Sequence, residues 1–338
     1  MATPPIRLRS LAAALVAVLA VATPLACTSD DSAPPSCRGL RPGSYEPSSA
    51  TTGVAAGSQL RPVSGDIVVT EPGTIIENQD IRGFVDVRTT DVTIRNSIVR
   101  GGAAATNRLA LITATHRAVR NLRIEGVKLQ PEHPALWVNG IMGHDYTARC
   151  VEVLETTDGF RAFNAVEPAR PTNVTITQSY CHDLAYWSPD PGHADNQTHN
   201  DCFQGEGATD VALTFNLLHA YVSTTVGSRN HPPDRPQALS AIMVNDLVVA
   251  GVRYQPTRWV VYGNWMDGGF IAVNCGDDAV ATNLGSFLRN VFDDGQYHQG
   301  PPTHTITCNA AIVVETGDGT PDQNVYRDGV PIRVRHNG

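Results

Sequence analysis

One short pattern recurs along this chain of 338 residues and restricts its fold more than any other feature. Each copy has a polar residue, apolar residues at alternate positions, and a second apolar pair a few residues later. Such alternation in short runs rich in β-branched residues is typical of β-strands, and helical periodicity is nearly absent. The full copies are DVTIRNSIVRGG (91–102), NLRIEGVKLQPE (121–132), NVTITQSYCHDL (173–184), DVALTFNLLHAY (210–221) and RWVVYGNWMDGG (258–269), and shorter copies occur at 149–159 and 286–295.

A second apolar run separates these copies. Its members are ALWVNG (135–140), RAFNA (161–165), CFQGEG (202–207), AIMVND (241–246), IAVNCG (271–276) and AIVVET (311–316). Two strand types that alternate many times, with turn residues between them, predict a stack of coils in which each coil buries its apolar side against its neighbours.

The copies DVTIRNSIVRG and NVTITQSYCHD resemble the repeat of the right-handed parallel β-helix proteins, the pectate-lyase-like superfamily. The resemblance covers roughly residues 62–338 and implies an all-β chain, a right-handed parallel β-helix built as a single solenoid domain. It is specific for the fold and not for a reaction. A β-sandwich or a propeller is the alternative, although propeller repeats would be more uniform in length.

The amino terminus has the features of a secretory leader. Arg7 and Arg9 precede an apolar run, 11–22, that is too short to span a bilayer comfortably. We expect a signal peptide at 1–26 and lipidation at Cys27, with cleavage after Ala22 as the alternative.

The rest of the chain fits a surface-anchored protein. Residues 27–61, rich in Ser, Pro, Thr and Gly, are expected to form a disordered tether. Lipidation of Cys27 would leave six of the seven cysteines for disulfides in an oxidising compartment. The prediction is therefore a secreted or cell-surface protein, lipid-anchored to a bacterial membrane.

The charge balance limits the partners. The formal net charge is −8, and removal of the leader with Arg7 and Arg9 makes it more negative. Nucleic-acid binding requires a basic surface and is not expected. We expect a monomer that contacts a polysaccharide, and a membrane only through the lipid anchor.

Equivalent positions in stacked coils should form columns of side chains. In the first strand type, one such column holds Arg100, Gln130, His182, His219, Asp267 and Asp293. Asn216, Asn264 and Asn290 are expected to form an internal ladder of amides. The second strand type predicts another column, either a ladder or a strip that faces sugar, at Asn139, Asn164, Gln204, Asn245, Asn274 and Glu315.

The segment 180–207 is the longest polar insertion, and three interpretations compete for it. The first is a catalytic site in which His199 and Asp201 form an acid/base pair, supported by His182 and Asp267. Substrate would contact Trp187, Tyr186, Gln204 and His219. The second is a Ca²⁺ site at Asp183, Asp190 and Asp195, although the spacing matches no defined loop. The third is a purely structural turn.

The pattern H-x-D-x-x-Q, here His199, Asp201 and Gln204, is similar to one in many secreted β-helix proteins. The resemblance implies a polysaccharide lyase or a glycoside hydrolase, and Ca²⁺ is the only cofactor it suggests. A lysine base is not expected, since the single lysine, Lys128, lies far from the insertion in sequence. The alternatives are a non-catalytic glycan-binding protein and a structural protein on the same scaffold.

Overall fold

The computed structural model describes residues 35–37, 39–103, 109–228, 238–275, 284–293, 324–327 and 329. The expected signal peptide and Cys27 lie outside these ranges. Within them, the regular structure is β-strand apart from one short 3-10 helix, η1 (Pro35–Cys37). No helix in the described ranges is long and apolar enough to cross a membrane.

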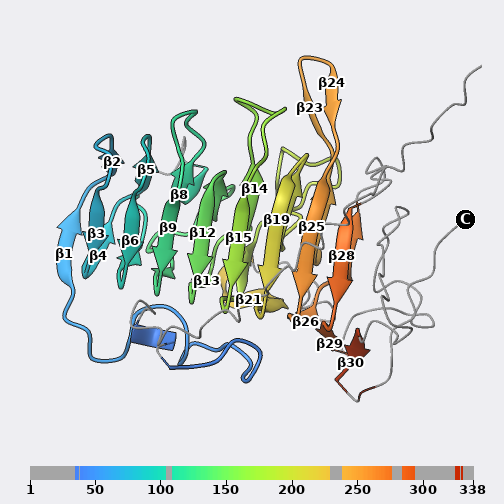
Figure 1. The fold of residues 1–338 in the computed structure, drawn as a ribbon, viewed down its shortest axis with the longest axis horizontal. Helices are drawn as coiled ribbons and strands as arrows, with labels where there is room; N and C mark the ends of the chain where they lie inside the picture. The colour runs from blue at the N-terminus through green and yellow to red at the C-terminus, as the bar shows by residue number, and fades with distance from the viewer. Residues whose placement is uncertain are drawn as a thin grey trace, which may run out of the picture. The chain divides into compact units, whose positions relative to one another are not determined.

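Most strands belong to three long sheets, here named A, B and C (Figure 1). Sheet A contains β1 (Arg61–Ser64), β4 (Gln79–Arg82), β7 (Ile98–Val99), β10 (Lys128–Leu129), β13 (Glu152–Leu154), β16 (Tyr180–His182), β20 (Leu217–Ala220), β26 (Trp265–Gly268), β29 (Val291–Phe292) and β30 (Val325–Tyr326). Sheet B contains β2 (Ile67–Val69), β5 (Val85–Val87), β8 (Ala110–Ala114), β11 (Asn139–Gly143), β14 (Phe160–Phe163), β18 (Asp201–Glu206), β22 (Ser240–Asn245) and β27 (Ile271–Cys275). Sheet C contains β3 (Ile75–Glu77), β6 (Thr93–Arg95), β9 (Leu122–Glu125), β12 (Tyr146–Arg149), β15 (Val174–Thr177), β19 (Thr209–Thr214), β25 (Thr257–Tyr262) and β28 (Gly285–Leu288).

The chain visits sheets A, B and C in turn, and one visit to each makes a coil. Every strand of the three sheets pairs in parallel with its counterparts in neighbouring coils, as when β14 lies between β11 and β18. The prediction of an all-β chain with stacked parallel strands is confirmed, and the order is consistent with a parallel β-helix. Two small additions project from the coils: β17 (Leu184–Tyr186) pairs with β21 (Val222–Gly227), and β23 (Leu247–Val249) forms a hairpin with β24 (Val252–Tyr254).

Left-handed residues turn the chain at both ends of the strands of sheet C, and they explain the polar positions of the repeat. At the entrance φ lies between 49° and 60°, at Asp91, Asn121, Asp145, Asn173, Asp210 and Arg258. At the exit φ lies between 42° and 56°, at Asn78, Asn96, Cys150, Gln178, Phe215 and Arg289. Asn and Asp tolerate this conformation better than most residues do, which is why they dominate the entrance.

The expected ladder of asparagines is confirmed at the turn from sheet C to sheet A. The side-chain amide of Asn216 donates to Oδ1 of Asn264 at 2.9 Å, and that of Asn264 donates to Asn290 at 3.0 Å. Asn324 continues the ladder, and Ser179 occupies its position one coil earlier. All four asparagines are buried, so each bond satisfies groups that water cannot reach.

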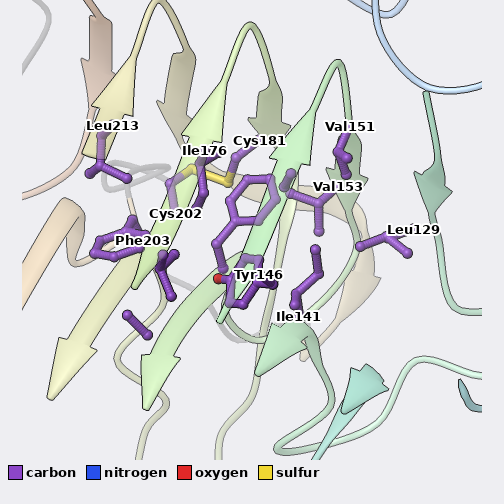
Figure 2. Packing of buried hydrophobic residues seen from close by; sticks show 14 of the residues in the cluster. Leu129, Ile141, Tyr146, Val151, Val153, Ile176, Cys181, Cys202, Phe203 and Leu213 are labelled. Atoms are coloured by element: carbon purple, nitrogen blue, oxygen red, sulfur yellow. A yellow bond between two sulfur atoms is a disulfide. The ribbon is translucent and has the colours of Figure 1, made fainter. Parts of the chain in front are cut away.

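The core lies inside the coils, where apolar side chains from all three sheets meet (Figure 2). Phe203 packs edge-to-face on Trp259, with ring centroids 5.4 Å apart. A disulfide between Cys181 of sheet A and Cys202 of sheet B crosses this core, and Cys275 is disulfide-bonded as well. Disulfides of this kind fit an oxidising, extracellular environment.

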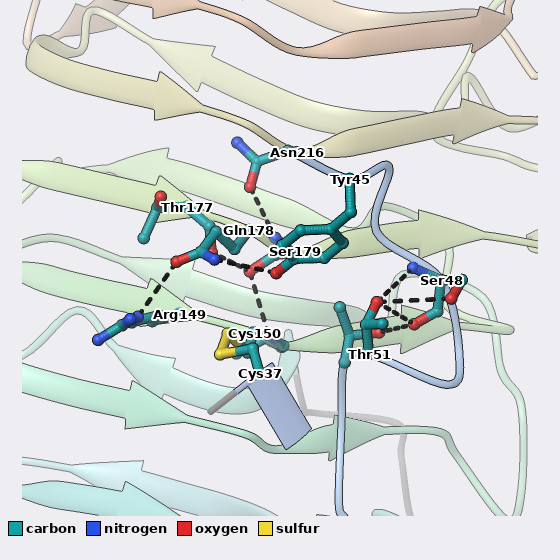
Figure 3. Close-up of a disulfide and its surroundings, with 12 residues drawn as sticks. Cys37, Tyr45, Ser48, Thr51, Arg149, Cys150, Thr177, Gln178, Ser179 and Asn216 are labelled. Carbon is teal, nitrogen blue, oxygen red and sulfur yellow. Dashed lines mark hydrogen bonds between the residues drawn. A yellow bond between two sulfur atoms is a disulfide. The ribbon is translucent and has the colours of Figure 1, made fainter. Parts of the chain in front are cut away.

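Residues 39–60, here called the strap, run along the coils before the first strand begins, although they lie in the range expected to be a tether. A disulfide between Cys37 and Cys150 fixes the start of the strap to the turn before β13 (Figure 3). The Gln178 amide donates to the Tyr45 hydroxyl at 2.9 Å, and Arg327 pairs with Glu46 at 2.6 Å. The strap is thereby attached to several coils.

Candidate active site

The long connections of the stack border sheet B. The insertion 183–200 joins sheet A to β18, whereas 164–173 and the hairpin β23–β24 join sheet B to sheet C. By contrast, only two residues separate sheet C from sheet A at each of 178–179, 215–216 and 263–264. Functional groups are more common on loops held by a rigid scaffold, so the outer face of sheet B is the first place to look.

The strand register defines a row of side chains along this outer face. The residues that precede three members of this row in sequence, Phe160, Phe203 and Val273, are fully buried and point inward. The row is Asp86, Thr113, Met142, Arg161, Gln204, Met243 and Asn274.

The amide column expected for the second strand type is wrong in detail. Gln204 and Asn274 do share the outer row, but Met243 lies between them. Asn245 lies opposite Glu206, and Asn139 lies opposite Ala110 at the start of its strand. The connections on both sides of sheet B differ in length between coils, so residues that align by counting in sequence do not occupy the same position along their strands.

A ladder of buried side chains marks the entrance to sheet B. The Asp158 amide donates to Oδ1 of Asn139 at 3.1 Å, and the Asp201 amide donates to Oδ1 of Asp158 at 3.1 Å. The Ser240 hydroxyl then donates to the Asp201 carboxylate. Two acidic residues therefore occupy positions that an amide or a hydroxyl holds in neighbouring coils.

Burial perturbs both carboxyl groups. It raises the pKa of Asp158 to about 6, against the influence of Arg161. It also raises the pKa of Asp201 well above its usual range, and the negative charge of Asp158 adds to the effect. Neighbouring buried carboxyls with raised pKa values are typical of sites that exchange protons.

Arg161 connects this pair of carboxyl groups to the outer face of sheet B. Its guanidinium lies 2.8 Å from Glu206 and 3.8 Å from Oδ2 of Asp158, and its side chain is 20% exposed. Its Nε is buried with no hydrogen-bond partner among the described residues. One cation thus joins a buried carboxyl with a raised pKa to a second carboxylate nearer the solvent.

The structure does not pair His199 with Asp201. His199 instead contacts Asp195, with 2.8 Å between Nε2 and Oδ2, and its ring packs 4.3 Å from that of His193. The expected pairing is wrong because residues 187–200 form turns rather than an extended strand, and because Asp201 turns into the buried ladder.

The two aromatic residues predicted to contact substrate, Tyr186 and Trp187, are largely turned away from solvent at their polar atoms. Tyr186 is 8% exposed, and its hydroxyl donates to Gln197 at 2.9 Å. The indole N–H of Trp187 is buried and has no partner within the described ranges. Trp137 was not predicted, yet it is 46% exposed and its indole approaches Asp190 at 3.3 Å, so it is the better candidate for stacking on a sugar.

The three Ca²⁺ candidates do not converge. Asp183 pairs with His182, Asp190 with His193 and Asp195 with His199. Over the part of the chain that the structure describes, no three His, Cys, Asp or Glu side chains are arranged to hold a metal ion.

The column predicted on sheet A is present. The register places His182 beside Leu154, a member that the repeat did not reveal, and His219 beside Asp267. His219 Nδ1 lies 3.9 Å from Oδ2 of Asp267, and Arg327 lies 3.4 Å from the same oxygen. We refer to His182, His219 and Asp267, with their neighbours in this column, as the sheet A row.

The sheet A row also contains perturbed groups. Burial, together with Asp293, raises the pKa of Asp267 to about 7, and burial lowers the pKa of His219. Burial lowers the pKa of His182, but hydrogen bonds to Asp183 and Glu152 have a larger combined effect, so the pKa of this histidine is raised. Glu152 is itself buried and also pairs with Lys128 at 3.1 Å, so this end of the row is engaged within the protein.

Sequence reasoning missed Asp158, Arg161 and Glu206. A signal was present, because TTDGFR (156–161) and HNDCFQ (199–204) share Asp and Phe at the same spacing. The two segments lie in register on β14 and β18. Comparisons with protein-family models, with curated proteins and with solved structures found no match to this chain.

Proposed function

We propose that this chain is a right-handed parallel β-helix of the pectate-lyase-like type that hydrolyses a glycosidic bond of a neutral polysaccharide. The proposed site is the outer face of sheet B beside the insertion 183–200. The observation that carries the proposal is the Asp158–Arg161–Glu206 arrangement, in which one guanidinium contacts two carboxyl groups of different environment.

The two carboxyl groups suit different roles. Asp158, whose pKa is raised to about 6, holds a proton in weakly acidic solution and can donate it to the leaving oxygen. Glu206, paired with Arg161, can activate a water molecule. Inverting glycosidases separate these groups by about 6.5–9.5 Å, which leaves room for the water, and an intervening guanidinium fits such a separation better than direct contact would.

Asp201 and Gln204 take supporting roles in this proposal. Asp201 donates its backbone N–H to Asp158 and so fixes the orientation of that carboxyl. Gln204 lies next to Arg161 in the outer row, where its amide can bind a sugar hydroxyl.

A hydrolase is favoured over a lyase because the cation of the site is already paired and the protein carries a net negative charge. Lyases of this superfamily need a cation to neutralise the uronate carboxylate, yet Arg161 is already engaged by Asp158 and Glu206. The net charge of −8 also disfavours an anionic polymer. A neutral polysaccharide is therefore the proposed substrate, and Ca²⁺ is not required.

The setting of the protein is part of the proposal. A secreted, monomeric protein, anchored by lipid at Cys27, would meet the polysaccharide outside the cell. The disulfides Cys37–Cys150 and Cys181–Cys202 support an oxidising environment.

One observation favours a non-catalytic glycan-binding protein instead. Asp201 is 1% exposed and Asp158 is 5% exposed, and both are bonded within the ladder. If the ladder is their whole purpose, the outer row would bind a polymer without cleaving it.

A depolymerisation screen separates these possibilities. Neutral and uronate polysaccharides are incubated with the protein, with and without a chelator, while reducing ends and the ultraviolet absorbance of unsaturated products are followed. We expect the wild-type protein to release reducing ends without an increase in absorbance. This activity should be lost in Asp158→Asn and in Glu206→Gln and retained in Asp267→Asn.

Other outcomes have clear meanings. Rising absorbance would show a lyase, and its loss on chelation would add Ca²⁺. Loss of activity in Asp267→Asn alone would move the site to the sheet A row, with its His182, His219 and Asp267. Inactivity of the folded protein towards every polymer would leave glycan binding.

A further inference from the structure

A hollow lies on the outer face of sheet B, away from Asp158 and Arg161. Its volume is about 400 Å³, within the range of pockets that hold small ligands. Asp86 and Thr113 form its floor, and Leu109, His116 and Val166 stand around it.

The strand register joins this hollow to the candidate active site. Thr113 lies opposite Met142, and Met142 lies opposite Arg161. Two steps between neighbouring strands correspond to about 10 Å. The hollow and the Asp158–Arg161–Glu206 arrangement therefore share one face and lie along one line that runs with the stack.

The charges of the hollow cancel locally. Arg88 donates to one carboxylate oxygen of Asp86 through two nitrogens, at 2.9 and 2.6 Å. An anionic group would have to displace Asp86 from Arg88. A neutral ligand could instead accept from and donate to this pair without breaking it.

The apolar members of the hollow are open to solvent. Leu109 is 50% exposed and Val166 is 49% exposed; Leu109 directly precedes β8, whereas Val166 follows the carboxyl end of β14. Apolar walls beside hydroxyl and charged groups match a sugar ring, which has C–H faces and a rim of hydroxyls.

We propose that this hollow binds a sugar residue of the same neutral chain that is cleaved beside Asp158. The inference rests on the proposed function and adds to it: the substrate is a linear polymer that lies along the stack, and cleavage is internal rather than at the chain end. Binding energy gathered at the hollow then positions the scissile bond.

The test measures binding and cleavage separately. The inactive variant Asp158→Asn is titrated calorimetrically with cello-, xylo- and manno-oligosaccharides of two to eight residues. Affinity should increase with length until the chain reaches the hollow. In a Leu109→Ser/Val166→Ser double variant on the same background, affinity for the long oligomers should fall about tenfold, whereas affinity for the short ones should not change.

A matched control is available on the hairpin. Val248 is 59% exposed and lies outside the hollow, so Val248→Ser should leave all affinities unchanged. Equal affinity of the double variant and its parent for the longest oligomer, or no binding of any of the three series, would overturn the proposal.

The two proposals fail in different ways. Length-dependent binding that the double variant loses, without cleavage of any polymer by the wild-type protein, would support the hollow and refute hydrolysis. Cleavage by the double variant with the same products and the same KM as the wild type would refute the hollow while the hydrolase stands.

Discussion

The backbone N–H of Asp201 donates to the side-chain carboxyl of Asp158 across adjacent coils, at 3.1 Å. One coil earlier, the backbone N–H of Asp158 donates in the same way to the side-chain oxygen of Asn139, so an amide performs this structural task as well as a carboxyl does. Since an ionisable group is costly to bury, its presence at both Asp158 and Asp201 calls for another reason than folding.

Asp158→Asn should preserve the fold and abolish cleavage. The asparagine keeps Oδ1 for the Asp201 amide, but it cannot donate a proton. General acid catalysis commonly contributes about 10²–10⁴-fold, so kcat should fall by at least about 100-fold. An unchanged melting temperature would show that the loss is chemical, and retained activity would exclude Asp158 as the acid.

The pH dependence of cleavage should follow Asp158. Because burial raises the pKa of this carboxyl to about 6 and only the protonated form donates, kcat/KM should decline above about pH 6. Arg161 lowers the same pKa, so in Arg161→Gln the decline should begin at higher pH, in addition to any loss of rate. If the pH at which kcat/KM begins to decline is the same in this variant as in the wild type, Asp158 is not the proton donor.

Stability should depend on pH in a way that Asp201→Asn reduces. A carboxyl whose pKa is raised by folding binds its proton more tightly in the folded state, so the free energy of unfolding decreases as pH rises from the unfolded value of 3.8 through the raised value. Asparagine does not titrate. The stability of the variant relative to the wild type should therefore increase as pH rises above the unfolded value, as measured by chemical unfolding, and a constant difference would argue against a buried titrating Asp201.

Asn264→Ala should destabilise the stack at the turn between β25 and β26. It removes the side-chain oxygen that accepts from the buried Asn216 backbone N–H and the side-chain amide that donates to the Leu213 carbonyl, and a buried group left without a partner costs about 1–3 kcal/mol. Asn245→Ala, at the end of β22 and outside the ladder, is the matched control. Equal melting temperatures for the two variants would show that the ladder adds no stability.

Replacement of Cys37 and Cys150 by serine should free the strap. Loss of a native disulfide typically costs about 2–5 kcal/mol, and here the bond closes a loop with a sequence separation of 113 residues. Limited proteolysis should then cut within residues 39–60, whereas the intact protein should resist there. Equal resistance would mean that the contacts of Tyr45 and Glu46 hold the strap by themselves.

The sequence was sufficient to predict sheet A but not sheet B, and the reason lies in the connections. Two-residue turns from sheet C to sheet A keep the register from coil to coil, so His219 and Asp267 could be aligned by counting. The asparagine ladder was predictable for the same reason.

The connections around sheet B vary in length, and counting fails there. Counting therefore grouped Gln204 with Asn139 and Asn245, although these two residues occupy other positions along their strands. The partner of His199 depends on how the turns of the insertion fold back, and no periodic pattern records that. The shared spacing of Asp and Phe in TTDGFR and HNDCFQ hinted at the pair Asp158 and Asp201, but the pairing of β14 with β18 is needed to show that the two residues are neighbours.

The disulfide between Cys37 and Cys150 also determines how the molecule would carry mechanical load. Tension applied to the chain ahead of Cys37 passes through this bond and enters the stack at the turn before β13, in its interior. The coils formed by β1 to β12 lie inside the covalently closed loop and bear none of that tension. A protein held by its amino terminus against a moving polymer could thus be pulled without being unwound from its first coil.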